Sequence, residues 1–76
     1  MESKLSCGVS IHEEMLEDKK VFVAECLELG ISDFGESVDE ALSNLRGAIN
    51  LVLEEAPEKA KVLEKQEPVL ITRLFL

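Results

Sequence analysis

Polar and apolar residues alternate at the start of the chain. Apolar side chains occupy every second position from residue 5 to residue 11, a period of two that is typical of a half-buried β-strand. Residues 21–27 form a second run rich in strand-forming side chains, and the polar residues 17–20 between the two runs predict a turn. The two runs therefore predict a β-hairpin with a loose, charged turn.

A third short strand and a long helix are predicted next. Residues 31–34 lie between Gly30 and Gly35, two glycines that supply turn geometry which a side chain would obstruct. Ser37 and Glu40 then form an S-x-x-E capping box, in which the hydroxyl accepts from the backbone three residues on and the carboxylate reaches back to the Ser37 N–H. A continuous apolar stripe at helical spacing follows, made of Val38, Ala41, Leu42, Leu45, Ala48, Ile49, Val52 and Leu53.

The last third of the chain is less regular. Pro57 disfavours helical geometry at the residue before it. Residues 58–65 are compatible with a short second helix or a kinked turn, and their charges indicate a solvated face. Residues 69–76 predict a final strand that joins the sheet at an edge, parallel to the first strand if it lies beside it. The order β-β-β-α-β predicts one α+β domain over residues 1–76, a two-layer sandwich of an antiparallel meander and one helix.

Composition narrows the possible functions. The chain has 76 residues and a net charge of −8, and no stretch approaches the roughly 20 apolar residues of a membrane span. No apolar segment of a secretory signal follows the first residues. The acidic balance repels phosphate backbones, so we expect no direct nucleic-acid binding. Only two cysteines, Cys7 and Cys26, are present, which favours buried free thiols and a reducing cytoplasm.

The sequence offers little catalytic chemistry. His12 and Glu14 would share one face of a strand, but two ligands without a third do not make a metal site. A ribonuclease H-like nuclease needs several carboxylates to hold two metal ions, and residues 5–11 and 69–76 contain none. We therefore expect a protein that is not an enzyme and that needs no cofactor or metal.

One family resemblance emerges from two segments. Residues 23–30, Val-Ala-Glu-Cys-Leu-Glu-Leu-Gly, and residues 35–42, Gly-Glu-Ser-Val-Asp-Glu-Ala-Leu, resemble the strand and the helix start of the HicB antitoxin family. The family pattern reads Y-x-A-x-C-P-E-L-P-G and then G-D-T-x-E-E-A-L. Leu27 stands where the family usually has proline, and the second proline is also missing. The resemblance covers roughly residues 20–53, and the β-β-β-α-β order extends it to the whole chain.

The resemblance implies both a fold and a function. HicB antitoxins have an N-terminal domain similar to a partial ribonuclease H fold, which binds HicA toxins. These toxins are small basic proteins that cleave mRNA, and the antitoxin covers their active region. The resemblance thus implies an antitoxin-like binding protein with a HicA-like partner. Family members typically add a C-terminal DNA-binding module, and we expect none here because the sequence given stops at Leu76.

Two surfaces are candidates for contact with partners. Four acidic residues around the second and third strands could match a basic toxin: Glu25, Glu28, Asp33 and Glu36. The final strand is apolar on both faces, and a single helix covers only one face of a sheet. We therefore also expect a homodimer or a higher assembly, with Val69, Ile71 and Phe75 at its interface. The alternative function is accordingly that of a homo-oligomer without a toxin partner, acting by self-assembly or by binding another ligand.

Overall fold

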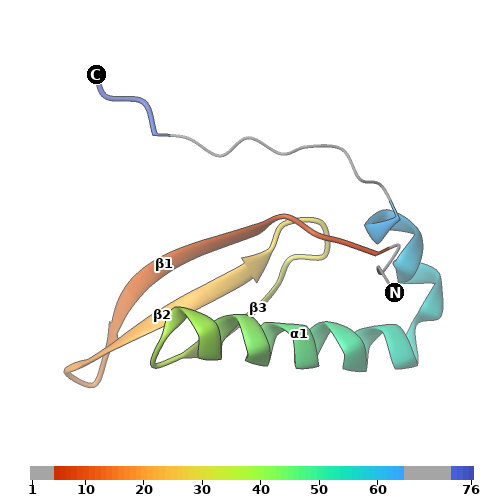
Figure 1. The fold of residues 1–76 in the computed structure, drawn as a ribbon, viewed down its shortest axis with the longest axis horizontal. Helices are drawn as coiled ribbons and strands as arrows, with labels where there is room; N and C mark the ends of the chain where they lie inside the picture. The colour runs from red at the N-terminus through yellow and green to blue at the C-terminus, as the bar shows by residue number, and fades with distance from the viewer. Residues whose placement is uncertain (1–4, 65–72) are drawn as a thin grey trace.

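We describe residues 5–64 and 73–76 of a computed structural model of the chain. Three strands are followed by one long helix and one 3-10 helix (Figure 1). The elements are β1 (Val9–Leu16), β2 (Lys19–Cys26), β3 (Ile31–Gly35), α1 (Val38–Glu55) and η1 (Pro57–Leu63). The strands form an antiparallel sheet in the order β1-β2-β3, so the predicted meander and its α+β class are confirmed.

The hairpin between β1 and β2 is tighter and longer than predicted. Pairing runs from Val9 opposite Cys26 to Leu16 opposite Lys19, so the predicted first strand at 5–11 starts and ends too early. The turn holds only Glu17 and Asp18, with φ of 50° and 64°, as in the two-residue type I′ turns that match strand twist. Because this turn is so short, Lys19 and Lys20, which were predicted to belong to it, lie in β2 instead.

Helix α1 covers one face of the sheet. Ala24 and Cys26 of β2 are fully buried against Ala41 and Leu45 of α1, and together they form the centre of the core. The small side chain of Ala24 allows α1 to approach the sheet closely. Asn44 of α1 also donates from Nδ2 to the carbonyl oxygen of Phe34 at 2.8 Å, which ties the helix to β3.

Gly35 is required where β3 passes into α1. A Cβ atom at this position would lie 2.6 Å from the backbone nitrogen of Ala41 and 2.9 Å from the carbonyl carbon of Glu40. Both neighbours are backbone atoms of the first helical turn and cannot rotate away. The absence of a side chain at Gly35 therefore allows the helix to begin directly against the sheet.

Helix α1 begins and ends where the sequence signals predict, and only the backbone partner of the Glu40 carboxylate differs. Ser37 caps the helix, and its hydroxyl accepts from the backbone N–H of Glu40 at 3.1 Å. The Glu40 carboxylate accepts from the backbone N–H of Glu36 at 3.2 Å, one residue earlier than the predicted partner. The helix ends at Glu55, and Pro57 begins η1. The segment after Pro57 is therefore a short second helix and not a kinked turn.

The 3-10 helix η1 closes one end of the core. Leu63 is only 2% exposed and belongs to the core cluster, although the charged residues around it indicated a solvated segment. The backbone N–H of Ser6 donates to the carbonyl oxygen of Leu63 at 2.9 Å, so η1 lies against the segment that leads into β1.

The predicted final strand is not confirmed. Its first part, with Val69 and Ile71, lies outside the described residues. Its last part, Arg73–Leu76, has no regular secondary structure. In this conformation Leu74 and Phe75 are 81% and 84% exposed, so neither side chain contributes to the core.

Candidate protein-interaction site

The sheet face opposite α1 combines apolar and acidic side chains. We call it the open face, and it is made of Ser10, His12, Glu14, Leu16, Lys19, Val21, Val23, Glu25, Ser32 and Phe34. Phe34 is 52% exposed and Leu16 is 51% exposed, whereas Val21 is buried at 5%. A shallow hollow of about 350 Å³ is lined by residues that include Val23 and Phe34. The open face therefore offers an accessible aromatic ring beside a shallow hollow.

The four acidic residues predicted to contact a partner do not form one patch. Glu25 is exposed on the open face, and Asp33 lies opposite Ala24, whose side chain is on the helix side. Glu28 accepts from the backbone N–H of Gly8 at 2.9 and 3.0 Å, and Glu36 forms an ion pair with Lys19. Glu28 and Glu36 thus make contacts within the chain, and only Glu25 joins the open face.

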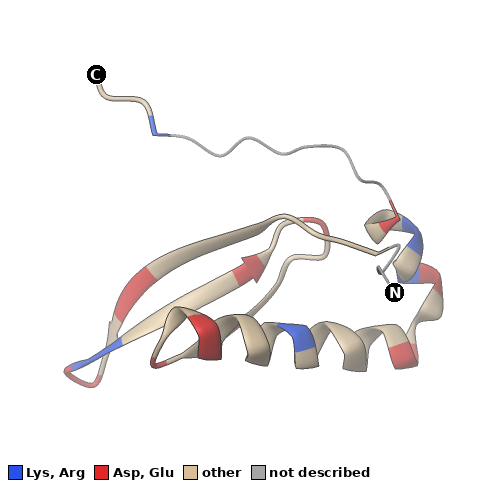
Figure 2. Cartoon of the chain, in the orientation of Figure 1, with Lys and Arg blue, Asp and Glu red and all other residues tan. Residues whose placement is uncertain are grey.

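Acidic charge is instead spread along the molecule. Figure 2 shows acidic segments on β1, at the β1–β2 turn, at the end of β2 and at both ends of α1. On β1, the Glu14 carboxylate is 58% exposed and lies 2.8 Å from the Nε2 atom of His12, which is on the same strand face as predicted. Glu14 and Glu25 are therefore the two carboxylates that flank the apolar part of the open face.

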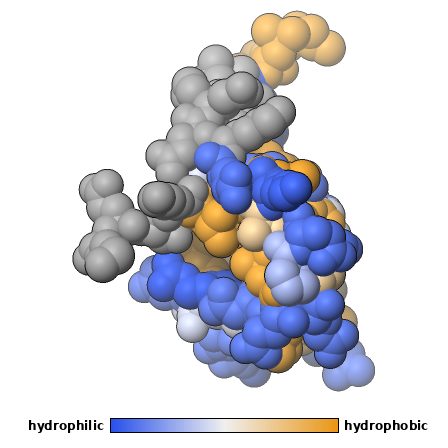
Figure 3. Space-filling view, turned by 90° about the vertical axis from the view of Figure 1, so that its right-hand side faces the viewer, coloured by the Kyte–Doolittle hydropathy of each residue, from blue (hydrophilic) through white to orange (hydrophobic). Residues whose placement is uncertain are grey.

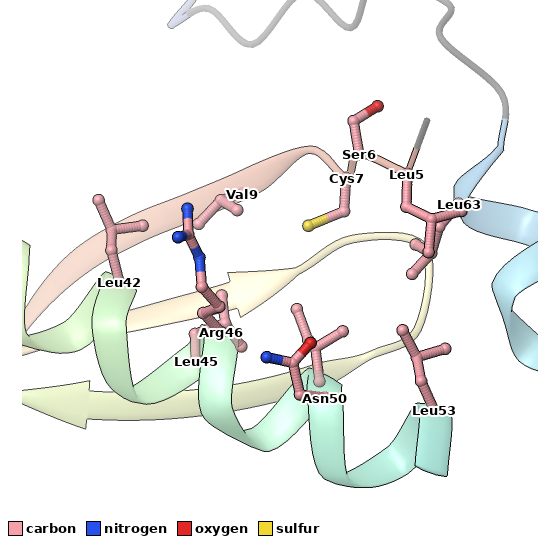
Figure 4. Close-up of a pocket in the computed structure, with 11 residues that line it drawn as sticks. Leu5, Ser6, Cys7, Val9, Leu42, Leu45, Arg46, Asn50, Leu53 and Leu63 are labelled. Atoms are coloured by element: carbon pink, nitrogen blue, oxygen red, sulfur yellow. The ribbon is translucent and has the colours of Figure 1, made fainter. Parts of the chain in front are cut away.

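A second accessible surface lies between β1 and α1, and we call it the groove. Helix α1 packs on β2 and β3, so α1 does not cover the helix-facing side of β1. A hollow of about 620 Å³ results, with walls that are mostly apolar (Figure 4). Its lining includes Cys7, Val9, Leu42, Ile49, Leu53 and Leu63. Arg46 and Asn50 of α1 add polar groups, and the guanidinium of Arg46 points from α1 toward β1.

Cys7, which lines the groove, lies next to Cys26 of β2. Both are free; Cys26 is buried, and Cys7 is partly exposed. Burial raises the pKa of the Cys7 thiol to about 11, helped by a hydrogen bond with Cys26 and by the negative charge of Glu28. A thiol with such a pKa is a poor nucleophile at neutral pH, so Cys7 does not provide a reactive centre.

We expect Cys7 to be alkylated slowly. A pKa raised from 9.0 to about 11 lowers the thiolate fraction near pH 7 by roughly 100-fold. Since the folded pKa is the higher one, the neutral thiol stabilises the fold fully below about pH 9, and this contribution is lost as pH rises toward 11. Iodoacetamide labelling of Cys7, followed by mass spectrometry across a pH series, measures the midpoint. A midpoint near 9, as for a free thiol, would contradict this assignment.

Metal and membrane sites are not found in the part of the chain that the structure describes. Within residues 5–64 and 73–76, no three His, Cys, Asp or Glu side chains converge as ligands for a metal ion. Among the same residues, no helix has the length and apolar character needed to cross a bilayer.

Sequence reasoning missed both the open face and the groove as sites. The alternation in β2 does place Val21, Val23 and Glu25 on one face, which is a usable signal for the open face. The groove has no comparable signal, because it depends on how far α1 lies from β1.

Comparison with protein-family models, with curated proteins and with solved structures finds no match for this chain.

Proposed function

We propose that this chain is an antitoxin-like binding protein of the HicB type, which neutralises a small basic mRNA-cleaving toxin by covering its active region. The observation that carries the proposal is the open face. Helix α1 covers only the other side of the sheet, so Phe34 and Leu16 remain about half exposed between acidic side chains. A large apolar side chain inside a polar rim is the usual arrangement of a protein-binding surface.

Charge defines the kind of partner. The chain carries a net charge of −8, and Glu14 and Glu25 flank the apolar part of the open face. A toxin that binds RNA needs a positive surface, so opposite charges would speed the encounter and orient the two proteins. We therefore assign the direct contacts with the basic toxin to Glu14 and Glu25. The carboxylates of Glu28, Asp33 and Glu36 contribute to the negative electrostatic potential of the chain.

The proposal concerns binding and not catalysis. Residues 5–11, which include the start of β1, contain no carboxylate, so the two-metal arrangement of a ribonuclease H-like active site has no ligand from that segment. The expected outcome of an assay is that the chain suppresses RNA cleavage by its partner and cleaves no RNA itself.

We expect Phe34→Ala to weaken toxin binding by about 30-fold. The change removes a ring that is 52% exposed, and loss of such a central aromatic anchor costs about 2 kcal/mol. The partner to test is a basic protein encoded in the neighbouring reading frame, and isothermal titration calorimetry measures its affinity. Leu51→Ala is the matched control, because Leu51 is 64% exposed on α1 and does not belong to the open face.

Two results would count against this assignment. Equal affinities for Phe34→Ala and Leu51→Ala would mean that the open face is not the contact surface. If the unmodified chain neither binds the basic neighbour nor restores growth of cells that express it, the antitoxin function itself is wrong.

The second candidate is a homo-oligomer without a toxin partner. It is favoured by the exposure of Leu74 and Phe75 at the C-terminal end of the chain. Phe75 belongs to the interface expected from the sequence, whereas Val69 and Ile71 lie outside the described residues. This candidate is compatible with the first, since self-association through the C-terminal end leaves the open face accessible.

A further inference from the structure

Two apolar surfaces of the chain do not contact each other in this structure. The first is the groove between β1 and α1, which is hollow over about 620 Å³. The second is the C-terminal end, where Leu74, Phe75 and Leu76 are almost fully exposed. Figure 3 shows these last residues as an apolar group that stands apart from the body of the molecule. An exposed apolar pocket and an exposed apolar segment on one chain are complementary surfaces.

We propose that the groove is the docking site for the C-terminal residues Leu74–Leu76 of a second copy of this chain. Each copy would place its C-terminal end in the groove of the other, which closes a symmetric dimer with two equivalent contacts. This inference does not depend on the proposed antitoxin function, because the groove and the open face lie on opposite sides of the sheet.

The chemistry of the groove fits this occupant. Most of its lining side chains are leucine, isoleucine and valine, which match Leu74, Phe75 and Leu76 in character. A hollow of about 620 Å³ lies within the ~300–1,000 Å³ range of pockets that hold drug-sized ligands, so it has room for more than one apolar side chain. Arg46 and Asn50 on α1 can donate hydrogen bonds to the backbone carbonyl groups of an incoming segment.

A second copy is the occupant that satisfies both surfaces at once. In residues 5–64 and 73–76, Leu74 and Phe75 are 81% and 84% exposed and the groove is hollow, so this described part of one copy leaves both surfaces accessible. Reciprocal exchange of identical segments buries both surfaces in both copies and needs no other protein. Within the part of the chain that the structure describes, β1 pairs only with β2, so a segment can approach the groove from the outer edge of β1.

The test uses two single variants, each of which damages one of the two surfaces. Phe75→Glu places a charge on the docking segment and leaves the groove intact. Leu42→Glu places a charge on the groove wall, at a residue that is 36% exposed, and leaves the docking segment intact. Leu42→Ser is the milder alternative if the charged variant does not fold by circular dichroism. Leu51→Glu, on an exposed position of α1 that does not line the groove, is the matched control.

Light scattering coupled to size exclusion should give twice the monomer mass for the unmodified chain and for Leu51→Glu. Phe75→Glu and Leu42→Glu should each give the monomer mass. Mixing these two variants should restore a dimer, because the intact groove of one copy accepts the intact segment of the other. The mixed dimer keeps one of its two contacts, so it should dissociate at a higher concentration than the unmodified dimer.

Three results would overturn the proposal. The first is a monomeric unmodified chain, which would include the case in which the C-terminal end folds into the groove of its own copy. The second is a Phe75→Glu or Leu42→Glu variant that stays dimeric. The third is a mixture of the two monomeric variants that remains monomeric. Mixing restores a dimer only if the C-terminal segment of one copy binds the groove of the other, so this result would mean that these two surfaces do not bind each other.

Discussion

Gly35→Ala should destabilise the protein by about 3 kcal/mol or more. The added Cβ would lie 2.6 Å from the Ala41 backbone nitrogen and 2.9 Å from the Glu40 carbonyl carbon, so β3 and the first turn of α1 must separate. Overpacking of this kind costs about 1–3 kcal/mol, and more where backbone atoms are involved. A chain of 76 residues has a total stability of about 4–11 kcal/mol, so a large part of it would be lost.

Urea unfolding followed by circular dichroism measures this effect, with Gly47→Ala as the matched control. A Cβ at Gly47 would have no atom within 4 Å apart from the neighbouring backbone of its own helix, and alanine is favoured over glycine inside a helix by about 1 kcal/mol. The same substitution should therefore destabilise at position 35 and stabilise at position 47. Equal midpoints for the two variants would show that α1 does not begin against the sheet as described. Nothing in the structure explains why position 47 is glycine.

Leu45→Ala should lower the free energy of unfolding by about 2–5 kcal/mol. Leu45 is 2% exposed and packs in the core cluster with Ala24 and Cys26, so its removal leaves a cavity between α1 and β2. Leu51→Ala makes the same exchange on the same helix at a side chain that is 64% exposed. Because helix propensity changes equally in both variants, the difference between their unfolding free energies isolates the burial of Leu45.

That difference should be at least about 2 kcal/mol, since substitutions of exposed residues usually change stability by no more than about 0.5 kcal/mol. A smaller difference would mean that the α1–β2 interface is loosely packed. It would also place the core elsewhere than around Ala24, Cys26, Ala41 and Leu45.

The elements with strong periodicity could be predicted from the sequence, and those set by tertiary contacts could not. The capping box at Ser37 and the apolar stripe of α1 predicted the helix and its start, because both signals are local. The length of β1 was predicted wrongly, because its charged second half forms a strand only through pairing with β2. Leu63 was missed for a similar reason, since its burial depends on where η1 meets the N-terminal segment.

The candidate site was less predictable than the fold. The acidic residues were identified by charge, but charge does not indicate whether a carboxylate faces solvent or already has a partner within the chain. Phe34 was placed correctly on a third strand, yet its exposure depends on which sheet face α1 covers. Alternation along a strand defines two faces and does not by itself identify the covered one.

The contact between the Glu28 carboxylate and the Gly8 backbone N–H affects how a charge-reversal screen should be interpreted. Glu28 lies in the β2–β3 loop and holds the segment that leads into β1 through two contacts at 2.9 and 3.0 Å. A Glu28→Lys variant loses this acceptor as well as its charge, so reduced binding would combine a local structural change with weaker attraction. Glu25→Lys changes charge at a side chain for which the structure gives no such backbone contact. In a charge-reversal scan of this protein, weaker binding of the position 25 variant therefore measures the loss of attraction to the partner. Weaker binding of the position 28 variant also contains the effect of the lost contact with Gly8.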